Sequence, residues 1–401
     1  MNNDLSASEA ARILGVSVAT LYSYVSRGLL TPTSTQASRS KRYPHEAVLR
    51  LAARKADAKR GGHMATAAMN WGVPVLETRI SRIADGRLYY RADDALALAD
   101  AATLEMTACI LWDDARHDYF AEAFSSLPEG LLERARALAQ GMAPLERAVA
   151  LMPVLAQALP AQTAHACGML QSGPALMRLL AAVLLEVEPS ALPLHQQVAL
   201  AWGADANQCE LIRAAMVLLA DHELNASTFT VRCVASTGAG LAATLSAGLA
   251  ALSGPRHGGG SSAAKVMLVA ALAAPSAMEY VAACHAAQDD SLEGYGHPLY
   301  PAGDPRAAYL LERLARLSAG VPKVAAILAI CTEAGGRQGM LPNADLALAA
   351  LELACGWPDS AGLILFALAR SAGWIAHAAE QAGTGAMIRP RARYVGRYQT
   401  A

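Results

Sequence analysis

The sequence has 401 residues, of which 54% are hydrophobic, 5% aromatic and 17% charged. This length exceeds one ordinary small domain and predicts two or three compact units with sizeable cores. A composition rich in alanine and leucine but poor in aromatics favours packed helices and argues against a β-sandwich, so we expect an all-α protein.

Charge is distributed unevenly along the chain, although the formal net charge is only −1. Residues 1–62 hold ten basic and four acidic side chains, a local net charge of +6. The remaining 23 basic and 30 acidic side chains give the rest of the chain −7. This asymmetry predicts a basic N-terminal module attached to a mildly acidic body.

The seven cysteines show no CxxC spacing, which argues against a disulfide framework or a zinc ribbon. The first ten residues lack a basic stretch followed by an apolar run, so we expect no secretory signal and a cytoplasmic location. Residues 233–255 are uncharged and long enough to span a bilayer. Their Gly, Ser, Thr and Ala content favours a buried helix instead, and we expect no membrane association.

The first predicted elements are two short helices. Ser6 and Glu9 have the spacing of a capping box, and Ala10 and Leu14 recur on one face of the helix that follows. Gly15 ends this helix, and a second one runs from about residue 17 to residue 28. Two short helices joined at a glycine predict a helix-turn-helix.

A basic turn at residues 38–43 and a third predicted helix at 46–60 follow. Residues 1–62 resemble the winged DNA-binding module of MerR-type regulators, with Arg39, Lys41 and Arg42 of the wing as candidate contacts to duplex DNA. The alternative is a three-helix packing module with surplus surface charge. No single side chain indicates contact with bases rather than phosphates.

Residues 72–100 combine an alternating apolar stretch with an Asp85-Gly86 turn, which predicts a small hairpin. From about residue 100 the pattern is helical, with predicted breaks at Pro128, Pro144, Pro160, Pro174, Pro189 and Pro193. Strands and helices do not alternate, so a dinucleotide-type α/β sheet is not expected.

Three turns rich in small residues each hold a histidine, at residues 221–227, 254–260 and 294–306. Glycines around a histidine let a substrate approach the backbone closely, which suits a ligand site. His257, surrounded by glycines, is the clearest candidate. The following seven are interpreted as structural: His45, His63, His117, His165, His195, His285 and His377.

Charged residues further along the chain are also candidates. Asp345 begins a predicted helix, where its pattern alone indicates a cap. Arg370 lies in an otherwise apolar helix and needs a partner or a ligand. Arg389 and Arg391 flank a proline near the C-terminus and have the fork geometry that pairs with carboxylates.

Taken together, DHELNAS, GPRHGG, GYGH with DPR, FALARSAGWIAH and RPR resemble the motifs of citrate synthase and 2-methylcitrate synthase. The resemblance covers roughly residues 72–401 and is strongest from residue 218 onward. It implies the citrate-synthase fold, with a large domain at 66–256 and 351–401 and a small domain at 257–350, preceded by the module at 1–62.

The resemblance also implies the role of each residue. His257 hydrogen-bonds the thioester oxygen of an acyl-CoA, Asp345 removes the methyl proton, and His297 gives a proton to the oxaloacetate carbonyl. The family's oxaloacetate-binding groups correspond to His222, Arg306, Arg370 and Arg389, and Arg389 is contributed by the partner in a homodimer. Candidate contacts to CoA are Arg256, Gly258 and Gly259.

The implied chemistry is consistent with the residue types. A thioester methyl is a poor acid, so a base can remove its proton only if the developing oxyanion is stabilised at the same time. No metal or redox cofactor is expected. Residues 298–303 lack the basic residue usual after GYGH, and Arg256 or Lys265 could take its place at the CoA phosphates.

Three functions remain open from the sequence. The first is condensation of acetyl-CoA with oxaloacetate to give citrate and CoA. The second is the 2-methylcitrate synthase reaction, which uses propionyl-CoA. The third is a DNA-binding regulator that senses a metabolite in a non-catalytic pocket. A proton-abstracting base at Asp345 favours the enzymes, whereas the basic N-terminal module favours the regulator.

Overall fold

The computed structural model describes residues 4–14, 16–18, 20–21, 25, 30, 32, 42–45, 48, 76–113, 117–121, 124, 127–160, 164–287, 292–317, 320–337 and 339–391. They belong to two compact units, Met1–Glu77 and Thr78–Ala401. The proposed division of the second unit into a large and a small domain stays a prediction.

The N-terminal unit contains the predicted first helix, α1 (Ala7–Leu14). Its capping box is confirmed, because Ser6 N donates to Glu9 Oε2 at 2.8 Å and Glu9 N donates to Ser6 Oγ at 3.3 Å. A short antiparallel pair, β1 (Asp4–Leu5) and β2 (Tyr43–Pro44), was not predicted. The small core of this unit is formed by Ala10, Ala11, Leu14, Leu21, Leu30, Tyr43 and Val48.

Most of the predicted DNA-binding surface lies outside the described residues. Arg39 and Lys41 are among those not described, and so is nearly all of the third helix predicted at 46–60. Arg42 is described, and it is exposed directly before β2. The wing and its contacts therefore stay predictions.

The second unit begins with the predicted hairpin, β3 (Ser81–Ala84) and β4 (Arg87–Tyr90). Asp85 and Gly86 both have positive φ, 52° and 72°, as a two-residue turn of this handedness requires. A third strand, β5 (Asp93–Asp94), pairs with β4. Asp94 then caps the first helix of the unit by accepting a hydrogen bond from Leu96 N at 2.8 Å.

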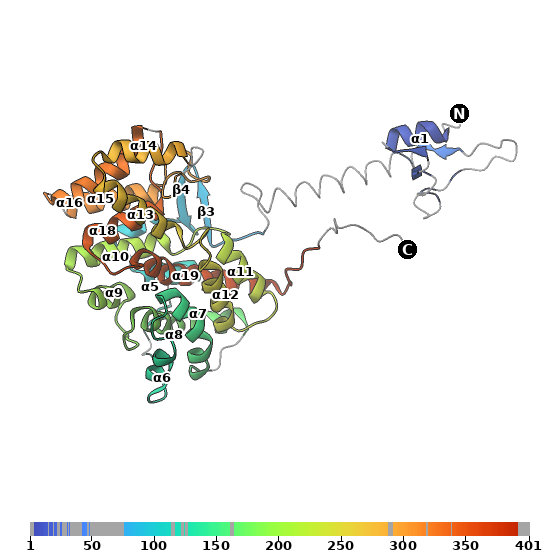
Figure 1. Ribbon diagram of the computed structural model, residues 1–401. Coiled ribbons are helices and arrows are strands. Elements are labelled where there is room, and N and C mark those ends of the chain that lie inside the picture. Colours follow the sequence, from blue (N-terminus) through green and yellow to red (C-terminus); the bar gives the residue numbers. More distant parts are fainter. Residues whose placement is uncertain are drawn as a thin grey trace. The chain divides into compact units, whose positions relative to one another are not determined.

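The rest of this unit is helical, which confirms the all-α prediction (Figure 1). The helices are α4 (Ala95–Ala101), α5 (Leu104–Leu111), α6 (Leu131–Leu138), α7 (Pro144–Leu155), η1 (Ala156–Ala158), α8 (Ala166–Leu185), α9 (Leu194–Trp202), α10 (Ala206–Leu219), α11 (Ala226–Ala235), α12 (Leu241–Leu252), α13 (Gly260–Ala273), α14 (Ala277–Ala287), α15 (Pro305–Leu317), α16 (Pro322–Ala329), η2 (Ile330–Ala334), α17 (Gly335–Arg337), α18 (Ala344–Cys355) and α19 (Ala361–Thr384).

Helix α19 forms the centre of the unit and packs against α5, α8, α10, α11 and α12 (Figure 1). Both α8 and α19 are long and apolar enough to cross a bilayer by length and composition alone. However, 67% and 89% of their most apolar windows are buried inside the unit. Such burial is typical of core helices, and it explains their apolar composition.

Two predictions about where helices begin and end are wrong. Pro174 lies inside α8 and does not end it, because the second half of that helix is buried in the core and packing outweighs the lost hydrogen bond. Residues 233–255 are not one buried helix either. Helix α11 ends at Ala235, a turn with Gly238 at φ 81° follows, and α12 begins at Leu241.

Candidate active site

His222 lies in the short turn between α10 and α11 and is buried. Its Nε2 is 3.0 Å from Tyr300 Oη, and its ring centroid is 5.1 Å from that of His297 in an edge-to-face arrangement. Burial lowers the pKa of His222 well below its ordinary value, and the positive charges of Arg306 and Arg370 lower it further. His222 is therefore a neutral imidazole at physiological pH.

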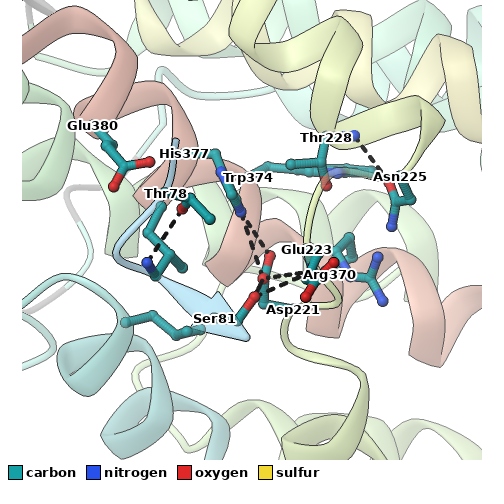
Figure 2. A network of polar contacts seen from close by, with 12 residues as sticks. Thr78, Ser81, Asp221, Glu223, Asn225, Thr228, Arg370, Trp374, His377 and Glu380 are labelled. Atoms are coloured by element: carbon teal, nitrogen blue, oxygen red, sulfur yellow. Dashed lines mark hydrogen bonds and ion pairs between the residues drawn. The ribbon is translucent and has the colours of Figure 1, made fainter. Parts of the chain in front are cut away.

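The residue before it, Asp221, is a fully buried carboxylate at the centre of a polar network (Figure 2). It accepts hydrogen bonds from Ser81 Oγ of β3 and from Glu223 N, the latter at 3.2 Å. His377 Nε2 of α19 lies 3.3 Å from Asp221 Oδ1. This network connects the hairpin, the His222 turn and the central helix.

The negative charge of Asp221 also raises the pKa of Arg370 and so favours its ionised form. Burial alone would raise the pKa of Asp221, but His377, Arg370 and Ser81 together lower it, so the carboxylate is ionised. Helix α19 can approach Asp221 closely because residue 373 is glycine. A Cβ at Gly373 would lie 2.3 Å from Asp221 Oδ1.

Arg370 of α19 is only 1% exposed, and its guanidinium is incompletely paired. Its Nε donates to Leu219 O at 2.9 Å, while Nη1 is buried without a hydrogen-bond partner among the described residues. The guanidinium carbon is 4.6 Å from the centroid of the Phe366 ring. Burial lowers its pKa to about 10, and it remains a cation with an unused donor. Such a group is suited to binding an anion.

His257 lies in the turn directly before α13. Its Nε2 is 2.8 Å from Ser227 Oγ, which is also 2.9 Å from Asn225 Oδ1 and 3.2 Å from Trp374 Nε1. Burial, with a smaller contribution from Arg370, lowers the pKa of His257 to about 4, so the ring is neutral. In the structure Ser227 donates its single hydroxyl hydrogen to Asn225 Oδ1. If that hydroxyl turns to His257 Nε2, Nδ1 of His257 carries the ring hydrogen and can donate it to a ligand.

The three glycines after His257 are required by close packing. A Cβ at Gly258 would lie 2.2 Å from Leu252 O, and one at Gly259 would lie 2.5 Å from Pro255 O. A Cβ at Gly260 would lie 2.6 Å from Asp345 Oδ2. The glycines therefore allow α13 to begin directly against the Asp345 carboxyl, in the turn that carries His257.

The candidate contacts to CoA differ in how they are placed. Arg256 is exposed beside His257. Lys265 is already engaged, because its Nζ lies 2.6 Å from carboxylate oxygens of both Glu352 and Asp359. Lys265 is therefore a poorer candidate for a phosphate than Arg256, and the roles predicted for Arg256, Gly258 and Gly259 stay predictions.

The turn that carries His297 is paired with the segment before α18. Gly296 N donates to Leu341 O at 2.8 Å, and Asn343 N donates to Gly294 O at 2.9 Å. The Asn343 side chain donates to Gly296 O at 3.0 Å, while its Oδ1 accepts from Asp345 N at 3.0 Å. One asparagine thus holds the His297 turn and caps the helix that carries Asp345.

The cap role that the local pattern indicates for Asp345 is therefore wrong, because Asn343 performs it. The Asp345 carboxyl is available for other chemistry. Burial raises the pKa of Asp345 to about 6. The negative charges of Glu293 and Asp304 also raise it, whereas the positive charge of Arg306 lowers it. A carboxylate with such a pKa is a stronger base than an exposed one, and it is still ionised at pH 7.

His297 and Arg306 are held by their own turn. His297 Nδ1 accepts a hydrogen bond from Leu299 N at 3.1 Å, so the neutral ring carries its hydrogen on Nε2. Burial and Arg306 lower its pKa to about 4. Arg306 is buried and forms a bidentate pair with Asp304, with distances of 3.0 and 2.8 Å. Asp304 Oδ2 also accepts from Ala344 N at 3.0 Å, which joins α15 to α18.

Arg389 is not part of this cluster within one chain. It is exposed in the segment after α19, which is anchored where Ile388 N donates to Ser236 Oγ at 3.0 Å. The structure therefore brings together His222, His257, His297, Arg306, Asp345 and Arg370 through the contacts described above, but not Arg389.

Comparison with known proteins identifies the family. The model of the citrate synthase C-terminal domain matches residues 68–391, and that of a helix-turn-helix domain matches residues 5–56. The chain belongs to the citrate synthase family. Citrate synthase 2 of Bacillus subtilis is 34% identical over 192 residues, which are 47% of this chain and 51% of that protein.

Another citrate synthase relative is the 2-methylcitrate synthase of Mycobacterium tuberculosis, 31% identical over 187 residues, which are 46% of this chain and 47% of that protein. The chain thus matches about half the length of these curated relatives. A solved complex of carboxymethyl coenzyme A and oxaloacetate with the citrate synthase of Thermoplasma acidophilum has a TM-score of 0.70 at 23% identity, covering 82% of this chain and 96% of that one. This likeness confirms the citrate-synthase fold.

Proposed function

We propose that this protein condenses an acyl-CoA, acetyl-CoA or propionyl-CoA, with oxaloacetate to give citrate or 2-methylcitrate and CoA. The observation that carries the proposal is the Asp345 carboxyl, with a pKa raised to about 6, placed against the first residue of the helix that follows His257. A base beside a neutral hydrogen-bond donor is the pair that enolisation of a thioester needs.

In the first step, Asp345 removes a proton from the carbon next to the thioester carbonyl. His257 donates a hydrogen bond from Nδ1 to the carbonyl oxygen, where negative charge develops. For Nε2 to accept in this tautomer, the Ser227 hydroxyl, 2.8 Å away, turns its hydrogen from Asn225 Oδ1 to His257 Nε2. Ser227 therefore orients His257, in the same way that a second hydrogen bond selects the tautomer of other histidines that act as donors.

In the second step, the enolate carbon attacks the carbonyl carbon of oxaloacetate, and His297 gives the proton on Nε2 to the carbonyl oxygen. Water then hydrolyses the thioester of the product and releases CoA. The tautomer of His297 supports this role, because the hydrogen bond from Leu299 N to Nδ1 leaves the hydrogen on Nε2. None of these steps requires a metal ion or a redox cofactor.

Oxaloacetate carries two carboxylates, and the cluster provides matching donors in Arg370, Arg306 and His222. The unpaired Nη1 of Arg370 is the strongest support, because a buried donor without a partner is costly unless a ligand supplies the acceptor. We further propose a homodimer in which Arg389 of the partner subunit completes each site. We also propose a cytoplasmic location, as expected for a chain whose seven cysteines show no CxxC spacing.

A thiol-release assay on the purified full chain tests this function. We expect CoA release that requires both oxaloacetate and an acyl-CoA. The ratio of kcat/KM for acetyl-CoA and propionyl-CoA then identifies the preferred donor, since one methylene in a pocket is worth only about 1–3 kcal/mol. Absence of oxaloacetate-dependent release with either donor contradicts the proposal.

The activity should depend on pH through Asp345. Its pKa of about 6 means that the carboxyl binds a proton as the pH falls below that value, and the protonated form is no base. We therefore expect kcat/KM for the acyl-CoA to fall roughly tenfold per pH unit below about pH 6. Stopped assays across pH 5–8 would measure this limb, and a profile that stays flat down to pH 5 would exclude Asp345 as the base.

We also propose that residues 1–62 bind duplex DNA, supported by the helix-turn-helix match and the local charge of +6. Affinity should fall steeply with salt, because phosphates that are neutralised by the protein release counterions. The slope of the logarithm of the binding constant against the logarithm of the salt concentration is about −0.9 for each such phosphate. Replacing Arg39, Lys41 and Arg42 by alanine should make the slope shallower by up to about 2.7. Fluorescence anisotropy with labelled duplex measures both quantities.

The control for this experiment is Arg316→Ala, which removes an exposed cation of the second unit and should leave the salt slope unchanged. Deleting residues 1–62 should abolish DNA binding. Unchanged binding after that deletion, or no binding of the intact protein at low salt, would show that the module is structural.

A further inference from the structure

Tyr300 occupies the middle of the cluster, between three residues to which substrate roles are proposed. It is 2% exposed, and its Oη is 3.0 Å from His222 Nε2. Its ring centroid is 5.0 Å from that of His297, and the Arg306 guanidinium carbon is 5.5 Å from the ring centroid. A side chain in this position can influence how each of these groups is presented.

The direction of the hydrogen bond between Tyr300 and His222 follows from where the protons are. Burial raises the pKa of Tyr300 above its ordinary value, so the phenol keeps its hydrogen. His222 Nε2 is the hydrogen-bond partner of that hydroxyl within the described part of the chain, and the neutral ring can accept. If Nε2 donated instead, the buried phenolic hydrogen would have no described acceptor, at a cost of roughly 1–3 kcal/mol.

We infer that Tyr300 is a positioning residue whose hydroxyl donates to His222 Nε2 and thereby fixes His222 in the tautomer with its hydrogen on Nδ1. The ring then presents an N–H donor, and not a lone pair, to an anionic substrate rich in oxygen. The inference rests on the proposed function where it names that substrate as oxaloacetate.

The turn that contains Tyr300 also sets the tautomer of His297, which is the opposite of the tautomer inferred for His222. Leu299 N donates to His297 Nδ1, so His297 carries its hydrogen on Nε2. Two consecutive residues, Leu299 through its backbone and Tyr300 through its side chain, thus make hydrogen-bond donors of both histidines. Arg306 and Arg370 lower the pKa of His222 through their positive charge, and the same positive potential favours an anion beside it.

Tyr300→Phe tests the inference, because it removes the hydroxyl and keeps the ring that packs against His297 and Arg306. Nitrogen-15 NMR of the full chain with labelled histidine reports which ring nitrogen of His222 is protonated, and the His222→Gln variant assigns its signals. We expect Nδ1–H in the wild type and a shift toward Nε2–H in Y300F. In steady-state assays, KM for oxaloacetate should rise roughly tenfold with little change in kcat, as expected for a lost buried hydrogen bond.

The matched control is Tyr295→Phe in the same turn. Tyr295 is also buried, and its hydroxyl donates to Ile330 O at 2.9 Å, away from the histidines. Y295F should change neither the His222 tautomer nor the KM. Equal effects of both substitutions, or an unchanged tautomer in Y300F, would overturn the inference. A wild type without oxaloacetate-dependent turnover would contradict the proposed function alone, since the NMR spectra would still decide the role of Tyr300.

Discussion

Asp345→Asn should lower kcat by roughly 10²–10⁴-fold, the range for loss of a positioned acid/base group. The amide has nearly the same shape as the carboxyl but cannot accept a proton at neutral pH. Oxaloacetate should still bind with an affinity close to that of the wild type, because the arginines and His222 are untouched. Steady-state kinetics measure the first quantity, and isothermal titration with oxaloacetate measures the second.

Stability measurements on the same variant exclude a folding defect. The pKa of Asp345 is raised from its ordinary value to about 6, so the folded state binds this proton more tightly than the unfolded state. Stability of the wild type therefore falls as pH rises from about 4 to about 6, and this group remains unfavourable at pH 7. The asparagine of Asp345→Asn does not ionise, so the variant does not lose stability in this way. Its thermal unfolding midpoint at pH 7 should equal or exceed that of the wild type.

The control is Asp113→Asn, which alters an exposed carboxylate 3.6 Å from Arg91, outside the cluster. Its kcat should remain within about twofold of the wild type, as for most surface substitutions. Near-normal kcat in purified Asp345→Asn, with the fold intact, would exclude Asp345 as the proton-abstracting base.

Arg389→Ala should lower kcat/KM for oxaloacetate by roughly 30-fold to several thousand-fold, the cost of leaving a desolvated carboxylate without one of its partners. Within one chain, Arg389 is exposed and separate from the cluster. The effect therefore requires that it reach the site of the other subunit. Steady-state kinetics with varied oxaloacetate measure this loss.

A mixing experiment distinguishes action in trans from action in cis. If Arg389 acts in trans, a mixed dimer of Asp345→Asn and Arg389→Ala protomers has one doubly damaged site and one intact site. With statistical exchange between twofold-symmetric dimers, activity should return to about one quarter of the wild-type value. A mixture as inactive as its parents, despite demonstrated exchange, would show that Arg389 acts in cis.

The same experiment contains its own control in Arg370→Ala. Arg370 and Asp345 belong to one chain's cluster, because the charge of Arg370 lowers the pKa of Asp345. Mixing Arg370→Ala with Asp345→Asn therefore leaves every site damaged, and no activity should return. Recovery in this pair as well would indicate reversion or contamination, and not complementation.

Local signals in the sequence predicted the parts of the fold that depend on local chemistry. The Ser6–Glu9 capping box and the Asp85-Gly86 turn each require particular residues at fixed spacing, and both are present as predicted. Arg370 was identified because a charge in an apolar helix needs a partner, and its Nη1 is indeed buried and unpaired among the described residues. Pro174 was misinterpreted because core packing outweighs its local preference.

The supporting residues of the site could not be predicted in the same way. Ser227 contacts His257 across 30 residues of sequence, and Tyr300 contacts His222 across 78. No local pattern contains such pairs. Asn343 was the exception, because an asparagine two residues before Asp345 is itself a strong N-cap signal that could have corrected the cap interpretation.

The central claim is the formation of a carbon–carbon bond between an acyl-CoA and oxaloacetate, and mass spectrometry of the products tests it most directly. The full chain, incubated with oxaloacetate and acetyl-CoA labelled with carbon-13 in the methyl group, should produce labelled citrate in a one-to-one ratio with free CoA. Propionyl-CoA should give labelled 2-methylcitrate if it is the preferred donor and carries the label. Asp345→Asn should form neither at a comparable rate. Release of CoA with labelled acetate or propionate, and no labelled tricarboxylate, would mean that the protein hydrolyses the thioester and would contradict the account.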